Sequence, residues 1–239
     1  MDADKGQLRY ASALTGLIIC AIFLAAHLIY IYIADPRRFP INTVKIAATY
    51  HHITHKQLET ILEGYLNASF FSLPIARLQN ELENLDWTDK VQVERIWPDV
   101  LKIRLVEKTP VAIWNNAMLT EDGAIFNEGG KLTEDSLPRL SGPHNQAREV
   151  LQVYKKMSKI LTEYGLHVAT LEWRENEAWE LTLSNGVRLR LGKRSLETRI
   201  NRFCKAYPAV FAAKSEQLVS VDLRYPRGMA VQWKKITGR

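Results

Sequence analysis

The sequence predicts an α+β fold that follows a single N-terminal transmembrane helix. Three features predict this class. Residues 10–34 form one uncharged apolar stretch, residues 39–109 alternate between strand and helix periodicity, and residues 110–235 contain many short strands and two helical segments. The composition, 46% apolar and 24% charged, is ordinary for a folded protein and argues against wholesale disorder.

The stretch from Tyr10 to Ala34 contains no Asp, Glu, Lys or Arg. At about 1.5 Å per residue, a helix of this length crosses the ~30 Å hydrocarbon core with some tilt. No small-x-small cleavage site follows it, so we expect an uncleaved anchor behind a tail of residues 1–9. Two basic residues precede the stretch and two follow it, which leaves its orientation undecided by charge.

Residues 39–109 predict one small unit in the order strand, helix, helix, strand, strand. A strand is expected at Phe39–Ala47, and Thr54 and Gln57 form a capping box for the first helix. Pro74 is placed to open the second helix. The last two strands form a hairpin that turns at Trp97-Pro98-Asp99.

The alternation within the second hairpin strand predicts its buried face. Leu101, Ile103 and Leu105 should face the two helices, while Lys102 and Arg104 should point away. Two amphipathic helices would then cover one face of a three-stranded sheet.

Residues 110–235 predict a second unit, entered through a strand at 111–114. A hairpin-like turn follows at residues 120–123, with short strands on both sides of it. A loop to Pro143 comes next, and then a helix that Gly165 should end. The expected apolar face of that helix is Val150, Tyr154, Met157, Leu161 and Tyr164. Strands are expected at 168–174, 179–183 and 187–191, with Asn185-Gly186 joining the last two in a hairpin.

The last third of this unit predicts one more helix and two strands. Ser195 should cap the helix, and Pro208 should kink or interrupt it. Its expected apolar face is Leu196, Ile200, Phe203, Tyr207 and Val210. The two strands are expected at 218–225 and 229–234, with Val221, Leu223 and Tyr225 on one face. An exposed terminal strand is a template for another chain, although a plain closing hairpin explains the pattern equally well.

The sequence gives no positive support for a catalytic or a metal-binding site. His51, His52 and His55 lack further ligands at zinc spacing and are better explained as loop residues. The acidic pairs Glu121-Asp122 and Glu134-Asp135 lack a calcium-loop pattern, and no phosphate loop or nucleophile motif is present. Cys20 lies in the span, so Cys204 has no disulfide partner in the rest of the chain. We expect no enzyme activity, cofactor or metal.

Charge is uneven along the chain. Residues 39–183 sum to −5, whereas residues 184–239 hold 13 basic and three acidic residues, or +10. A basic module suits nucleic acid, anionic lipid or an acidic protein. Phe203 and Tyr207 fall on an apolar helix face, where they would be core and not a base-stacking platform, and this argues against nucleic acid.

Several of these features together resemble one known family. The run from Val93 through Trp97-Pro98 to Glu107-Lys108-Thr109-Pro110 and Trp114, after a short tail and a single span, resembles FtsQ, called DivIB in Gram-positive bacteria. The closing run from Val221 to Trp233 is similar to the Gram-negative form. The resemblance covers the chain from the anchor onward.

The resemblance implies a POTRA domain at 39–109, a family-type β-domain at 110–235 and a short tail at 236–239. It implies a non-enzymatic scaffold of the divisome in the inner membrane, with residues 1–9 cytoplasmic and about 35–239 periplasmic. The implied partners are FtsB and FtsL, with FtsK, FtsW, FtsI and FtsN as further candidates. The implied role is regulation of septal peptidoglycan synthesis.

The resemblance also implies a partner site at the last strand, where FtsB would add a strand. The matching positions are Arg224, Tyr225, Gly228 and Trp233. Arg224 would offer a planar donor fork to a partner carboxylate. Pro226-Arg227 departs from the family pattern and would remove one backbone donor from the edge.

Two other classes of protein lack the sequence features that they would need. An outer-membrane assembly or secretion factor with POTRA domains would need further copies of the domain or a β-barrel series, and neither pattern is present. A membrane-anchored cell-wall hydrolase would need paired carboxylates or a metal constellation that the sequence does not supply.

Overall fold

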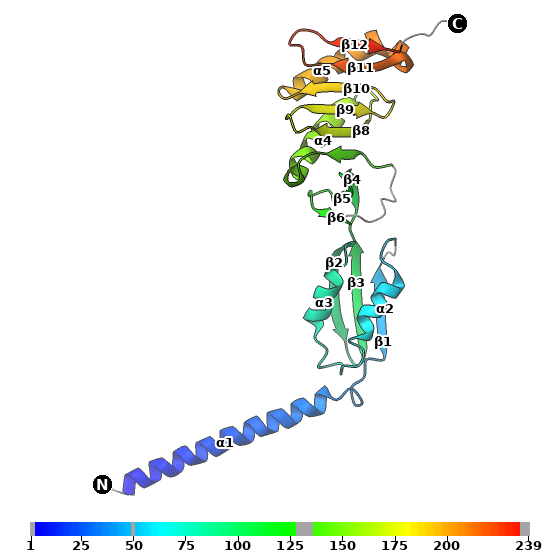
Figure 1. The fold of residues 1–239 in the computed structure, drawn as a ribbon. Helices are drawn as coiled ribbons and strands as arrows, with labels where there is room; N and C mark the ends of the chain where they lie inside the picture. Colours follow the sequence, from blue (N-terminus) through cyan, green and yellow to red (C-terminus); the bar gives the residue numbers. More distant parts are fainter. Residues whose placement is uncertain (1–2, 49–50, 128–135, 235–239) are drawn as a thin grey trace. The chain divides into compact units, whose positions relative to one another are not determined.

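The computed structural model describes residues 3–48, 51–127 and 136–234 (Figure 1). The predicted acidic pair Glu134-Asp135 and the short tail at 236–239 lie outside these residues. The chain divides into two compact units, residues 1–108 and 109–239, and each is described by itself.

The first unit begins with α1, Ala3–Ala34. This helix starts well before Tyr10, so the predicted tail is partly helical. Residues Thr15–Ala34 are long and apolar enough to cross a membrane, and none of this segment is buried against the protein. The single apolar span predicted from the sequence is therefore present as one continuous helix.

The rest of the first unit is a three-stranded sheet covered by two helices (Figure 1). Its strand order is β1-β3-β2, with β1 parallel to β3 and β2 antiparallel to it. The βααββ order predicted from the sequence is thus correct. The elements are β1 (Thr43–Ala48), α2 (His55–Glu63), α3 (Ile75–Glu83), β2 (Thr88–Ile96) and β3 (Val100–Glu107).

Local signals account for these elements. Thr54 Oγ1 accepts from the Gln57 amide at 3.3 Å, and the Gln57 side chain accepts from the Thr54 amide at 2.9 Å, which confirms the capping box. Pro74 is the residue before α3 and not its first helical residue. Leu101, Ile103 and Leu105 are buried as expected, together with Leu58, Leu62, Leu78 and Leu82 from the helices.

The second unit is built on a nine-stranded mixed sheet, in the order β12-β11-β10-β9-β8-β7-β4-β5-β6. Two helices, α4 (Ala147–Thr162) and α5 (Leu196–Ala206), pack against it. The strands are β4 (Pro110–Trp114), β5 (Ala117–Thr120), β6 (Ile125–Phe126), β7 (Arg139–Ser141), β8 (Val168–Trp173), β9 (Trp179–Leu183), β10 (Arg188–Gly192), β11 (Leu218–Asp222) and β12 (Ala230–Trp233).

One strand was missed by the sequence prediction. β7 is three residues long and lies where a loop was expected, whereas β6, two residues long, is one of the short strands expected around the 120–123 turn. A strand of three residues is too short to show alternation. β7 nevertheless bridges β4 and β8 with parallel pairing on both sides, so it connects the two halves of the sheet.

The Asn185-Gly186 hairpin is present, with β9 and β10 antiparallel. Gly186 has φ +84° and its N–H donates to the Leu183 carbonyl at 2.8 Å, and the Val187 carbonyl accepts from Leu183 at 2.9 Å. Asn185 has no positive φ. The loop is therefore a three-residue turn that closes with a left-handed glycine.

Two predicted helix faces require correction. Tyr164 lies beyond the last residue of α4 and is 36% exposed, so it does not continue the buried stripe. After α5, residues Tyr207–Phe211 form a π-helical turn with Pro208 near its start. The wider turn shifts the buried face of the helix by one residue. Phe211 is therefore buried, with 1% of its surface exposed, whereas Val210, which was expected on that face, is 54% exposed.

The predicted cap of α5 is also wrong. Ser195 precedes the helix but lies in the left-handed region, with φ 57°, and its side chain makes no cap hydrogen bond.

Candidate partner-binding edge of the second unit

The edge of interest is β12, the first strand in the nine-stranded sheet order. It pairs antiparallel with β11, with Val231 opposite Val221 and Ala230 opposite Asp222. No other strand in the described part of the chain pairs with its outer side. An edge strand of this kind presents backbone N–H and C=O groups to an incoming chain.

Trp233 and Tyr225 are the large aromatic residues beside this edge. Trp233 ends β12, is 37% exposed and lies 6.1 Å from the ring of Phe211. Tyr225 is 54% exposed and lies in the loop between β11 and β12. Residues 225–230, from this loop and the start of β12, line an open pocket of about 540 Å³. Exposed aromatic surface therefore lies in the loop before this four-residue strand and at its last residue.

The strand predicted at 218–225 ends instead at Asp222. The Asp222 carboxylate accepts a hydrogen bond from the Arg224 backbone N–H at 3.0 Å, which turns the chain out of the sheet. Leu223 stays buried, but Tyr225 leaves the face that it was expected to share with Val221. Pro226 lies in the same loop and not in β12. Its lack of a backbone N–H therefore removes no hydrogen-bond donor from β12.

The Arg224 guanidinium is hydrogen-bonded to a carboxylate of the same chain. Nη2 lies 2.6 Å and Nε 3.0 Å from Oδ2 of Asp222. These hydrogen bonds hold the pKa of the Asp222 carboxyl below its ordinary value, against the opposing effect of burial. Nε and Nη2 of Arg224 are therefore engaged within the chain, and the donor role of Arg224 toward a partner stays a prediction.

Arg199 and Arg202 hold the loop from α5. Arg202 Nη2 donates to the carbonyls of Leu223 at 2.9 Å and Tyr225 at 2.8 Å, and its Nη1 donates to Pro226 at 2.7 Å. Arg199 donates to the carbonyls of Leu191 and Arg224. We call this pair the arginine clamp. The sequence showed these residues as part of a basic module, and their spacing of three on one helix was the available signal.

Gly192 makes room for the clamp. It ends β10 with φ +73°, and a Cβ added there would lie 2.7 Å from Arg199 Nη1 and 3.1 Å from Arg224 Cγ. Gly228, one of the predicted site residues, is different. A Cβ there would meet nothing within 4 Å, and its φ is outside the left-handed region. The fold requires the glycine at 192 and does not require the one at 228.

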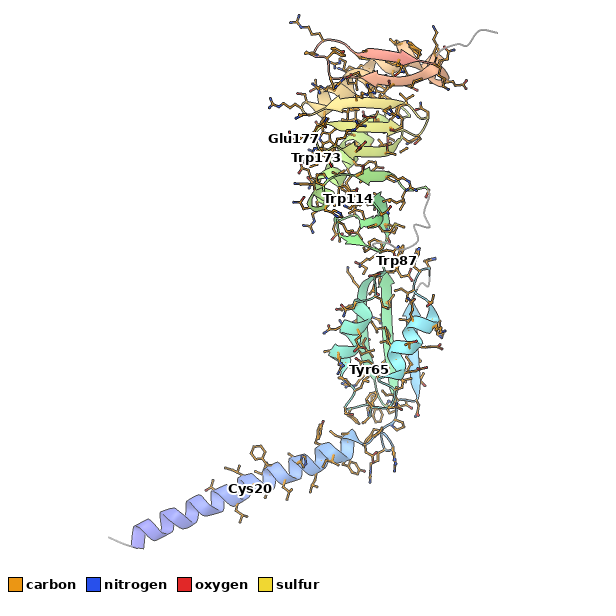
Figure 2. The ribbon with its side chains drawn as sticks, in the orientation of Figure 1. Cys20, Tyr65, Trp87, Trp114, Trp173 and Glu177 are labelled. Atoms are coloured by element: carbon orange, nitrogen blue, oxygen red, sulfur yellow. The ribbon has the colours of Figure 1, made fainter. Side chains whose placement is uncertain are left out.

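A second arrangement lies in the first unit, at Glu107 of the Glu-Lys-Thr-Pro run. Its carboxylate accepts from the backbone N–H groups of Ile53 at 2.9 Å and of His51 and His52 at 3.2 Å. The His52 ring stacks on Trp87, which precedes β2, with centroids 3.5 Å apart. Trp87 is labelled in Figure 2.

Burial raises the pKa of Glu107, but these amides and the His52 side chain outweigh it, so its pKa lies below the ordinary value. The histidine loop is thus held by a carboxylate. Among the described residues, no group of three or more His, Cys, Asp or Glu is placed to hold a metal.

The fold defines a class of protein. It is a chain with one N-terminal apolar helix that fits a single membrane span, followed by a βααββ domain and a larger mixed-sheet domain.

Comparison with known families identifies both domains. Residues 39–108 match the FtsQ-type POTRA domain, and residues 112–224 match the C-terminal domain of cell division protein FtsQ/DivIB. Cell division protein FtsQ of Coxiella burnetii is 33% identical over 84% of this chain and 83% of its own length.

FtsQ of Shewanella oneidensis is 34% identical over 91% of this chain and 83% of its own length. FtsQ of Alcanivorax borkumensis is 31% identical over 95% of this chain and 89% of its own length. The chain belongs to the FtsQ family of cell division proteins. The resemblance seen in the sequence motifs is confirmed.

Proposed function

We propose that this protein is a non-enzymatic scaffold of the divisome that binds FtsB and FtsL through the β12 edge. It would link early and late division proteins and so regulate septal peptidoglycan synthesis. The observation that carries the proposal is β12 itself, an edge strand with no described neighbour on its outer side and with Tyr225 and Trp233 exposed beside it.

The physical basis is strand addition. Backbone hydrogen bonds along an edge supply affinity, and side chains that flank the edge supply selectivity. Aromatic side chains are enriched among the residues that dominate binding energy. Gly228 fits this site because the fold leaves open space around it, so a partner backbone has room to approach there.

The topology belongs to the proposal. Residues 1–9 would lie in the cytoplasm, residues 10–34 would span the inner membrane, and the POTRA domain at 39–109 and the β-domain at 110–235 would be periplasmic at the septum. A long downstream domain crosses a membrane largely regardless of the arginines that flank the span. FtsK, FtsW, FtsI and FtsN would contact the POTRA domain or the membrane segment.

The test is a calorimetric titration of the full chain, in nanodiscs, with the periplasmic segment of FtsB from the same cell. We expect Tyr225→Ala and Trp233→Ala each to weaken binding by at least about tenfold, or ~1.4 kcal/mol, with the circular dichroism spectrum unchanged. Tyr164→Ala is the matched control, because it removes an exposed tyrosine elsewhere in the same unit. Unchanged affinity in both aromatic variants would move the site away from β12.

A further inference from the structure

Apolar side chains gather at the end of the first unit that directly follows α1. They come from the segment after α1, the α2–α3 loop and the β2–β3 turn. Phe71 is 43% exposed, Ile96 40% and Trp97 78%. Figure 1 shows the α2–α3 loop and the β2–β3 turn at the end of the sheet where β1 begins. We call Phe39, Phe71, Ile96 and Trp97 the tip.

Contacts join the segments that carry the tip. The rings of Phe39 and Phe71 meet edge to face at 5.0 Å, and the Phe70 N–H donates to the Phe39 carbonyl at 2.8 Å. The Arg95 guanidinium donates to the Phe71 carbonyl at 3.2 Å, and Ile96 and Trp97 follow directly in the chain. Asn42 joins this end to the hairpin turn through a 2.8 Å hydrogen bond to Asp99.

The chain holds the tip close to the end of α1. Only Asp35 to Arg38 separate Ala34 from Phe39, and a chain of this length spans at most about 18 Å. The Asp35 carbonyl accepts from the N–H groups of Arg38 at 3.1 Å and Phe39 at 3.2 Å, so this linker is folded into a turn. Ser69 also donates to the Ile33 carbonyl at 2.6 Å.

Cations accompany the aromatic residues. Arg37 and Arg95 are exposed, and the Arg38 guanidinium lies 4.4 Å from the ring centre of Tyr32 in α1. Tryptophan and tyrosine concentrate at the headgroup level of membranes, and basic side chains pair there with lipid phosphates. An exposed tryptophan next to an exposed isoleucine has no role in the core of this unit.

We propose that the tip docks on the phospholipid interface of the membrane that α1 spans, with Trp97 inserted at headgroup level. Phe39 lies within ~18 Å of the last residue of α1, which places the tip near that interface. The POTRA domain would then be held against the membrane by two attachments, α1 and the tip. The proposal rests on α1 as a membrane span and is independent of the site at β12.

The experiment uses the full chain in nanodiscs of phosphatidylethanolamine and phosphatidylglycerol, made with and without acyl chains brominated near the headgroup. The Trp97 signal is the emission of the unmodified chain minus that of Trp97→Phe. We expect brominated lipid to lower this signal at least about twofold, because bromine quenches only nearby indoles at the interface.

Trp87→Phe supplies the matched control. Trp87 and Trp97 flank β2 at its two ends, roughly 30 Å apart at ~3.3 Å per residue, so the Trp87 signal should not change. Ile96→Asp should restore Trp97 emission without lowering the unfolding midpoint, since Ile96 is exposed.

Equal Trp97 emission in the two kinds of disc would overturn the proposal. Failure of the chain to enter the discs would overturn its premise, that α1 spans the membrane. Neither result would bear on FtsB binding at β12.

Discussion

The guanidinium of Arg202 holds Tyr225 by its backbone, with Nη2 2.8 Å from the Tyr225 carbonyl oxygen. The same side chain bonds the carbonyls of Leu223 and Pro226. Tyr225, which we propose contacts a partner, is therefore positioned by Arg202, which a partner does not need to touch. A hydrogen bond with a charged donor contributes about 1.5–3 kcal/mol, so three on one loop fix its path.

Removal of the clamp should weaken partner binding with a smaller effect on the fold. We expect Arg202→Ala to lower affinity for the FtsB segment at least about tenfold, because the 223–226 loop loses its anchor. Lys205→Ala is the control, since it removes the same charge from an exposed position on α5. Calorimetry gives the affinities. If both variants lose affinity equally, the effect is one of net charge and not of loop position.

The two glycines near the edge should respond differently to alanine. Gly192→Ala should destabilise the second unit by about 1–3 kcal/mol, because its φ is left-handed and the added Cβ would meet Arg199. Gly228→Ala should leave stability unchanged within ~0.5 kcal/mol. Chemical denaturation of both variants provides the measurement. A stable Gly192→Ala would show that Arg199 can move away without loss.

Glu107 should make the stability of the first unit depend on acid pH. The pKa of its carboxyl is lowered in the folded state. Its contribution to the free energy of unfolding is therefore fully present at pH values above the ordinary pKa of 4.5, and it is lost as pH falls through the folded-state pKa. Glu107→Gln should remove that dependence and lower stability by about 3 kcal/mol at neutral pH, since one neutral oxygen replaces a carboxylate that serves three amides.

The measurement for Glu107 is thermal unfolding of both proteins between pH 3 and 7, a range of about four units chosen to bracket ordinary carboxyl pKa values. Parallel curves for the two proteins would show that Glu107 does not carry the pH dependence.

The register of β3 can be tested with a matched pair of carboxylates. Ile103 is 1% exposed, so Ile103→Asp would bury an unpaired charge and cost several kcal/mol, on the order of 4. Arg104→Asp places the same group on the exposed face and should leave the unit folded. Circular dichroism and denaturation of the two variants compare the faces directly. Equal loss in both would contradict the observed register.

Cys204 should be inert to thiol reagents. It is fully buried in α5, and burial, with a contribution from Glu163, raises the pKa of its thiol to about 11. In a Cys20→Ser chain we expect alkylation at pH 8 only after denaturant is added. Labelling of the native chain at the rate of a free thiol would indicate that α5 opens readily.

Sequence reasoning recovered the parts of the fold that local chemistry encodes. The capping box at Thr54, the turn at Trp97-Pro98-Asp99 and the alternation of Leu101, Ile103 and Leu105 each depend on residues close together in the chain. β7 was missed because three residues show no period, and its pairing is decided by strands distant in the sequence.

The candidate site was predicted less completely. Tyr225, Gly228 and Trp233 came from resemblance to the family, and the exposure of both aromatic residues is consistent with that role. Their function stays a prediction. Arg224 was assigned a donor role toward a partner, which also stays a prediction. The Asp222 carboxylate two residues earlier already bonds Nε and Nη2 of its guanidinium. The Asp222–Arg224 contact depends on where β11 ends. The alternation of apolar and polar residues placed that end at residue 225, three residues beyond Asp222.

For the proposed partner, the arginine clamp would affect the rate of association and not the lifetime of the complex. Arg199 and Arg202 bond neutral carbonyls, so their charge still extends into solvent and can guide an acidic segment, while the bonded N–H groups are unavailable to it. Added salt would therefore slow the arrival of such a segment, since the field is screened over about 10 Å at 0.1 M ionic strength. Once bound, its residence time would depend on backbone pairing and the aromatic contacts, which salt scarcely alters.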